Sequence, residues 1–169
     1  LFLIIEGIKA GKFDPAKLIY INMDDDSTGL ATKARLAEEY GFRMVADGHQ
    51  GFEAKKFRLA MEEMISSNSA NGFIVILDTL KKFVNIMEKG KSTNFAKVCR
   101  QFVLKGGTII ALSHTNKNPD SAGKTVYGGT TDIIDDFDCG YILETVSQEP
   151  ESGIKVVEFE NIKKRGNVT

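Results

Sequence analysis

The chain has 169 residues, of which 42% are hydrophobic and 27% charged, a composition typical of one globular domain. Lys and Arg number 22 and Asp and Glu 23, and the formal net charge of −1 excludes a histone-like or polybasic protein. Two cysteines are too few for a disulfide scaffold, and no apolar run approaches the roughly 20 residues of a membrane-spanning helix. We therefore expect a single cytoplasmic domain over residues 1–169, with no membrane anchor.

Apolar periodicity predicts an alternation of helices and strands along the chain. Apolar residues at helical spacing, with glycine stops, predict helices at 1–10, 27–40, 57–65, 80–87 and 95–103. Continuous or alternating apolar runs predict strands at 17–23, 42–45, 73–77, 108–112, 139–143 and 154–162. The predicted fold class is α/β, with three layers and a mostly parallel sheet flanked by helices. The strand at 108–112 is expected to be buried.

Polar residues follow three of the apolar strands. Asp24 and Asp25 follow the first, Asp78 and Thr79 come at the end of another, and His114 follows a third. The carboxyl ends of parallel strands open on one edge of the sheet, where ligands bind, so we expect these side chains to share a pocket. One carboxylate can hold Mg²⁺ through water, and a second can orient an attacking water for phosphoryl transfer.

Each of these residues also has an ordinary structural explanation. Asp78 could cap the helix that follows it, and Asp24–Asp26 could be carboxylates favoured by the dipole at a helix start. A lone histidine such as His114 is more often a loop residue with a satisfied hydrogen bond than a catalytic group. The coincidence of these residues at successive strand ends favours a functional site.

The order of these segments resembles the RecA-like ATPase core, and more narrowly the DnaB- and RepA-type replicative helicases and their phage and plasmid relatives. Residues 73–78 resemble the Walker B strand, and residues 109–117 resemble the sensor strand, where RepA-like ATPases commonly carry a histidine. Residues 20–25 resemble the strand that delivers the catalytic carboxylate, and residues 128–138 resemble a Gly/Ser-then-acidic stretch. Residues 162–167 resemble the Lys-x-Arg fingers of the family.

The resemblance implies a function and a role for each matching residue. It implies an oligomeric, ring-forming ATPase that couples ATP hydrolysis to transactions on DNA, with single-stranded DNA as the expected partner. Asp78, with Thr79, would bind ATP and Mg²⁺, and Asp24 or Asp25 would polarise the attacking water. His114 would sense the γ-phosphate, and Lys163 and Arg165 would stabilise charge in a neighbouring subunit. Lys117 and Lys124 would contact DNA.

Two departures from the family pattern qualify these expectations. The pattern G-x-x-x-x-G-K-[ST] of the Walker A phosphate loop does not occur in the 169 residues, which predicts a fragment whose first strand and phosphate loop lie upstream of Leu1. The family's catalytic carboxylate is usually Glu, and Asp is one methylene shorter. Two alternatives remain open. The chain could be a RecA-like assembly module without ATPase activity, and Lys163 and Arg165 could simply lie at the solvated end of a strand.

The missing phosphate loop gives a first testable expectation. Backbone N–H groups and a helix N-terminus supply most of the binding of a triphosphate, and two bare carboxylates repel it. We therefore expect the 169-residue chain by itself to be inactive and to bind ATP weakly or not at all. Isothermal titration measures this affinity, and a micromolar dissociation constant would contradict the expectation.

Overall fold

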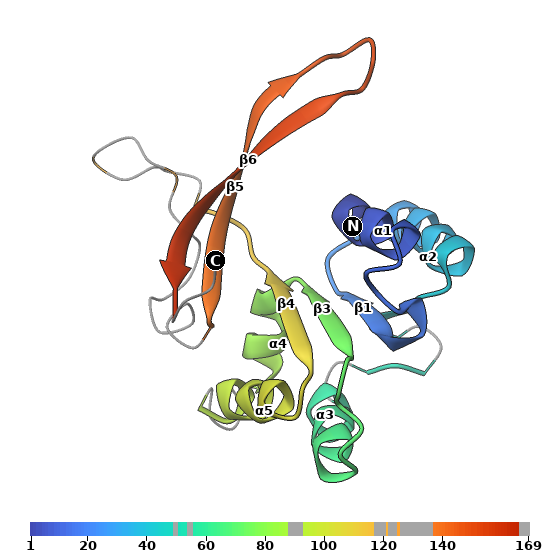
Figure 1. Ribbon diagram of the computed structural model, residues 1–169, viewed down its shortest axis with the longest axis vertical. Coiled ribbons are helices and arrows are strands. Elements are labelled where there is room, and N and C mark those ends of the chain that lie inside the picture. The colour runs from blue at the N-terminus through green and yellow to red at the C-terminus, as the bar shows by residue number, and fades with distance from the viewer. Residues whose placement is uncertain are drawn as a thin grey trace. The chain divides into compact units, whose positions relative to one another are not determined.

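The computed structural model describes residues 1–48, 51–53, 56–87, 93–116, 121, 125 and 137–165. The chain divides into two compact units, Leu1–Ser113 and His114–Thr169 (Figure 1). The prediction that both units belong to one domain stays a prediction.

Helices and strands alternate along the first unit as the apolar pattern predicts. Its helices are α1 (Phe2–Lys9), α2 (Ser27–Tyr40), α3 (Phe57–Ser66), α4 (Leu80–Met87) and α5 (Thr93–Leu104), and a short 3₁₀ helix covers Pro15–Lys17. Its strands are β1 (Leu18–Asn22), β2 (Arg43–Ala46), β3 (Ile74–Asp78) and β4 (Thr108–Leu112). The expected elements of this unit are confirmed, with small shifts at their ends.

The four strands form one parallel sheet in the order β2-β1-β3-β4. In the register of this sheet Asn22 lies beside Asp78, and Asp78 lies beside Leu112. The ends of β1, β3 and β4 therefore reach the same level at one edge. The α/β class and the parallel sheet flanked by helices are confirmed.

One face of the sheet packs against α1 and α2. Because side chains alternate along a strand, Leu18, Tyr20 and Ile76 point to this face, where they form a buried cluster with Ala37 of α2. Residues of α1 pack against the same cluster. This arrangement sets the first turn of both helices above the carboxyl edge of the sheet.

The helices α3, α4 and α5 lie on the other side of the sheet (Figure 1). Three phenylalanines join them: the ring centre of Phe57 lies 5.1 Å from that of Phe83 and 6.2 Å from that of Phe95. Phe102 of α5 is fully buried. The apolar stripes predicted for these helices therefore form the second core.

The prediction that residues 108–112 form a buried strand is wrong. Exposed and half-buried residues alternate along β4, and Ile110 and Leu112 expose 36% and 40% of their surface. Within the described residues β4 is the last strand of the sheet, and the cluster beneath α1 and α2 centres on β1 and β3. An apolar sequence favours burial of a strand, but a strand at the edge of a sheet can have the same sequence and remain partly exposed.

The end of α2 gives a test of the backbone argument. Gly41 stops this helix in the left-handed conformation, with a φ of 76°, and a Cβ there would meet Pro15 at an ordinary 3.8 Å. The strain of an alanine would therefore come from the backbone alone, so we expect Gly41→Ala to lower the free energy of unfolding by about 1 kcal/mol. Urea denaturation measures it. Gly41→Asn should cost less because Asn tolerates this conformation, and equal midpoints for Gly41→Ala and the native chain would contradict the argument.

In its described residues the second unit is a long antiparallel hairpin of β5 (Cys139–Gln148) and β6 (Lys155–Lys164). Both predicted strands are present, and β5 runs five residues beyond its expected end at Leu143. Leu143 lies opposite Phe159, and both are exposed. The alternation predicted for the second strand therefore marks one apolar side of a hairpin.

Candidate functional site

A buried asparagine shapes the loop that follows β1. Asn22 is 1% exposed, and its Oδ1 accepts hydrogen bonds from the backbone N–H groups of Asp24, at 3.1 Å, and Asp25, at 3.0 Å. Its Nδ2 donates to Oδ2 of Asp25 at 2.9 Å. An Asn side chain that bonds the backbone two and three residues on stabilises a tight turn. The turn fixes the direction in which the Asp25 carboxylate points.

The third aspartate of this loop caps α2. Oδ1 of Asp26 accepts the backbone N–H of Gly29 at 2.9 Å, as an N-cap residue does. The helix-start explanation is thus confirmed for Asp26. Gly29 also lies against Asp25, because a Cβ at this glycine would be 3.0 Å from Cγ and Oδ2 of Asp25.

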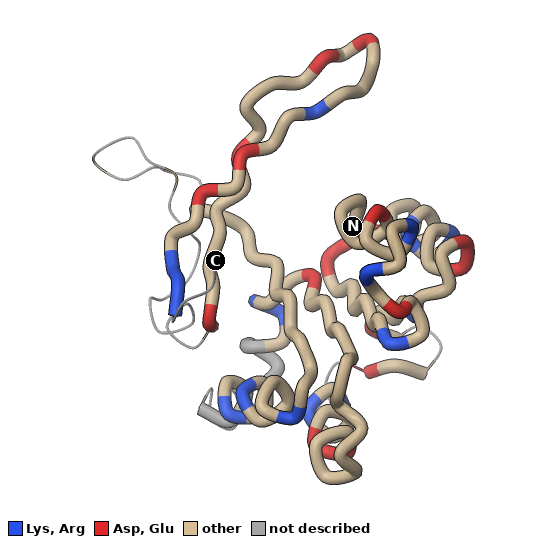
Figure 2. Tube along the Cα trace, in the orientation of Figure 1, with Lys and Arg blue, Asp and Glu red and all other residues tan. Residues whose placement is uncertain are grey.

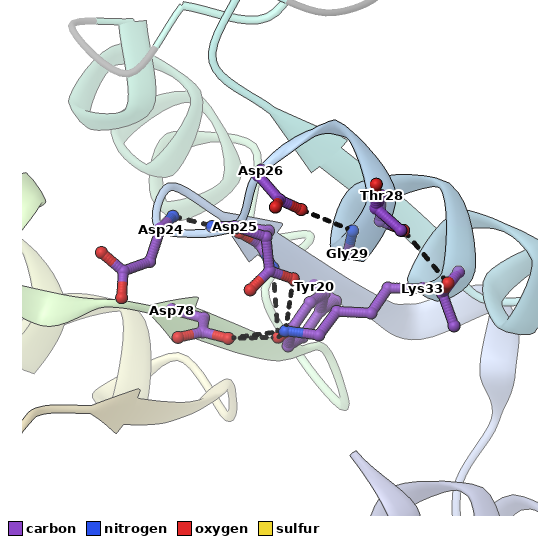
Figure 3. A network of polar contacts seen from close by, with 10 residues as sticks. Tyr20, Asp24, Asp25, Asp26, Thr28, Gly29, Lys33 and Asp78 are labelled. Atoms are coloured by element: carbon purple, nitrogen blue, oxygen red, sulfur yellow. Dashed lines mark hydrogen bonds and ion pairs between the residues drawn. The ribbon is translucent and has the colours of Figure 1, made fainter.

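Lys33 of α2 reaches over the sheet and joins the ends of β1 and β3 (Figure 3). Its Nζ lies 2.7 Å from Oδ2 of Asp25 and 3.4 Å from Oδ2 of Asp78, and it donates to the hydroxyl of Tyr20 at 3.0 Å. The Tyr20 hydroxyl in turn donates to Oδ2 of Asp78. The backbone of the two strand ends is joined as well, because the N–H of Met23 donates to the carbonyl of Asp78 at 2.5 Å.

The network keeps its ammonium charged and its phenol neutral. Burial and the hydrogen bond to Asp78 raise the pKa of Tyr20 to about 12. Burial lowers the pKa of Lys33, but hydrogen bonds to Asp25 and Tyr20 and the charge of Asp78 outweigh it, so this pKa lies above its ordinary value. A raised lysine pKa stabilises the fold below the unfolded value, and this stability is lost only as pH rises through the folded value. The ion pairs of Lys33 therefore persist through neutral pH.

Negative charge predominates at this edge of the sheet. Figure 2 shows acidic positions at the ends of β1 and β3, and in the network Lys33 contacts two of them. The start of α1 faces the same edge, because Leu1 lies close enough to Lys33 and Asp78 to feel both charges. The start of a helix attracts anions, and carboxylates attract cations. An edge with both, where the aspartates outnumber the lysine, is suited to a ligand that combines an anion with a cation.

The structure places the predicted acidic residues together. Asp24, Asp25 and Asp78 all lie at the carboxyl edge of the sheet, and in Figure 3 the Asp24 carboxylate points away from Lys33. Asp78 is the last residue of β3, α4 begins at Leu80, and the described contacts of the Asp78 carboxylate are with Tyr20 and Lys33. Thr79 is buried, and its hydroxyl donates to the carbonyl of Leu112 at 2.9 Å, which ties β3 to β4.

The other predicted residues belong to the second unit or lie outside the described part of the chain. His114 is exposed and is the first residue of the second unit. Lys163 lies opposite Gly140 in the hairpin, and Arg165 forms an ion pair with Asp138 at 3.6 Å. Lys117 and Lys124 lie outside the described residues. The roles implied for these four basic residues and the histidine stay predictions.

Sequence reasoning did not single out Tyr20 and Lys33 as members of the site. Tyr20 stands two residues before Asn22, so the strand period places both on the face that α2 covers. Lys33 stands four residues after Gly29, one helical turn further along α2, and therefore follows the glycine that packs on Asp25. A search for charged residues on the covered face of α2 would have found Lys33.

The residues at this edge can be tested against the predicted Mg²⁺. Within the described ranges, no three His, Cys, Asp or Glu side chains form a group that could hold a metal ion. Mg²⁺ needs only one or two carboxylates when water and phosphate oxygens complete its shell. Oδ2 of Asp78 is engaged by Tyr20 and Lys33, while in Figure 3 the other oxygen points away from Lys33. The donor set therefore fits a hydrated Mg²⁺ that a nucleotide brings with it.

Comparison with protein-family models and with curated proteins gives no match. In the part of the chain that the structure describes, none of the helices has the length and apolar character required to traverse a lipid bilayer.

Proposed function

We propose that the chain forms part of the nucleotide site of a RecA-like ATPase that couples ATP hydrolysis to transactions on DNA. The observation that carries the proposal is the register of β1 and β3, in which Asn22 pairs with Asp78. This register brings Asp24 and Asp25 from one strand and Asp78 from its neighbour to the carboxyl edge of a parallel sheet. Ligands of open α/β sheets bind at this edge.

The contacts at the edge divide the chemistry between two aspartates. The resemblance of the sequence favours Asp24 as the carboxylate that polarises the attacking water, while Asp25 is bound by Lys33 and Asn22. Asp78 would hold the water shell of a bound Mg²⁺ through the oxygen that points away from Lys33. The metal ion, when bound with nucleotide, would neutralise charge on the β- and γ-phosphates.

The connections of the sheet support a phosphate-binding loop at this edge. α2 connects β1 to β2 on one face, and α1 packs on that same face. A parallel strand leading into α1 would, by the right-handed crossover rule, lie on the β4 side of β1. There β4 pairs on only one side within the described residues. The loop between such a strand and α1 would open beside Asp24 and Asp78.

The remaining parts of the proposed function rest on the resemblance of the sequence. They are γ-phosphate sensing by His114, fingers at Lys163 and Arg165 acting on a neighbouring subunit of a ring, and contact of Lys117 and Lys124 with single-stranded DNA. Charge-stabilising fingers contribute about 10³–10⁵ in rate in phosphoryl transfer. The ion pair of Arg165 with Asp138 would have to exchange for a phosphate contact in that step.

ATP hydrolysis by the gene product that contains these residues tests the proposal. We expect turnover that requires Mg²⁺ and that increases when single-stranded DNA is added. A gene product that binds ATP but does not hydrolyse it, or that binds none, would instead support the assembly module.

A further inference from the structure

We propose that Lys33 is a positioning residue of this site, which holds Asp25 and Asp78 in place at the ends of β1 and β3. The inference rests on the proposed function for its kinetic consequence, but its structural part stands on contacts within the first unit.

Lys33 contacts both strand ends at once. Its ammonium lies 2.7 Å from Asp25 in the loop after β1 and 3.4 Å from Asp78 at the end of β3. The side chain is about one quarter exposed, at 26%, and its Nζ lies 5.5 Å from the centre of the Tyr20 ring. Packing on the ring and the hydrogen bond to the Tyr20 hydroxyl restrict the lysine to this position. A partly buried ammonium with two carboxylate partners fixes the separation of those partners.

Asp25 anchors the loop that follows β1. Asp25 receives the ammonium of Lys33 and the amide of Asn22 on the same oxygen, Oδ2. The network thus anchors the loop after β1 through Asp25.

The close approach of α2 to Asp25 supports this anchoring role. A Cβ at Gly29 would push on Asp25, because it would lie 3.0 Å from Cγ and Oδ2 of that aspartate. Gly29 and Lys33 are one helical turn apart, so the helix confines Asp25 from two successive turns. Gly29→Ala should therefore move the Asp25 carboxylate away from Lys33 without removing any charge.

Hydrogen exchange in the 169-residue chain tests the positioning role independently of ATP. In Lys33→Met we expect the amides of residues 23–26 to exchange about tenfold faster than in the native chain, with exchange in β1, β3 and the body of α2 unchanged. Lys33→Arg should restore most of the protection, and Gly29→Ala should reproduce the local loss. Lys9→Met is the matched control, since Lys9 has one carboxylate at 2.9 Å and a tyrosine ring at 5.5 Å but, among the described residues, no second carboxylate.

Kinetics of the gene product give the second readout. Lys33→Met should lower kcat about tenfold or more while the KM for ATP changes by less than about threefold, because the positions of the two strand ends that carry the carboxylates affect the chemical step. Lys9→Met should leave both constants unchanged.

Three outcomes would overturn the inference. They are unchanged exchange at residues 23–26 in Lys33→Met, a uniform rise over the whole first unit, or a change in KM alone. A native protein without ATPase activity would remove the proposed function, whereas local loss of protection would still establish the positioning role of Lys33.

Discussion

Asp78→Asn and Asp24→Asn are each expected to lower the kcat of ATP hydrolysis by the gene product by about 10²- to 10⁴-fold, the contribution of a positioned acid–base group. An amide at position 78 can still accept the Tyr20 hydrogen bond, so we expect the fold to be retained while the charge that we propose orders hydrated Mg²⁺ is lost. An amide at position 24 keeps its backbone bond to Asn22 but cannot accept a proton from water. Steady-state hydrolysis with saturating Mg²⁺ measures both effects.

Asp26→Asn is the matched control for these two variants. It makes the same chemical change in the same loop, and Asn caps a helix as well as Asp does, so α2 should keep its start at Ser27. Its kcat should remain within about twofold of the native value. Near-native turnover in Asp78→Asn and Asp24→Asn, or an equal loss in all three variants, would contradict the proposed roles.

Phe83→Ala is expected to have the largest effect on stability, a loss of about 3–5 kcal/mol in the free energy of unfolding. Phe83 is 1% exposed, and its ring meets that of Phe57 edge-on at 5.1 Å. The variant loses apolar burial, leaves a cavity and removes an aromatic pair. A loss of this size is comparable to the whole stability of many domains, so the chain should be largely unfolded in moderate urea.

Phe2→Ala separates burial from the mere presence of an aromatic ring. Phe2 is 83% exposed on α1, and its removal should change the free energy of unfolding by less than about 0.5 kcal/mol. Urea denaturation followed by far-UV circular dichroism measures both variants. A loss below about 1 kcal/mol in Phe83→Ala would show that the packing of α3, α4 and α5 does not form a core.

The layered part of the fold could be predicted because its apolar pattern is unambiguous. The run before Asp78 is apolar throughout, as expected for a strand covered on both faces, and β3 is an inner strand that pairs with β1 and β4. The same reasoning was wrong about the burial of β4. The residues of β4 are as apolar as those of β3, but the number of neighbouring strands depends on topology and not on the strand's own sequence.

The site could be predicted only in part, for a similar physical reason. Acidic residues at strand ends are visible in the sequence, and parallel pairing then brings Asp24, Asp25 and Asp78 to one edge. The partners that set their roles, Tyr20 and Lys33, come from positions 13 residues apart that meet only after α2 folds back over β1. Their contact depends on the helix orientation, which local periodicity does not specify.

The most direct test of the central claim is the location of the metal–nucleotide complex on the gene product. Mn²⁺ bound with ATP broadens the NMR signals of nearby amides, so it reports where the complex lies. We predict that the amides of residues 23–26 and 78–80, at the ends of β1 and β3, broaden first. Broadening confined to the β5–β6 hairpin, with sharp signals at those two strand ends, would contradict the claim.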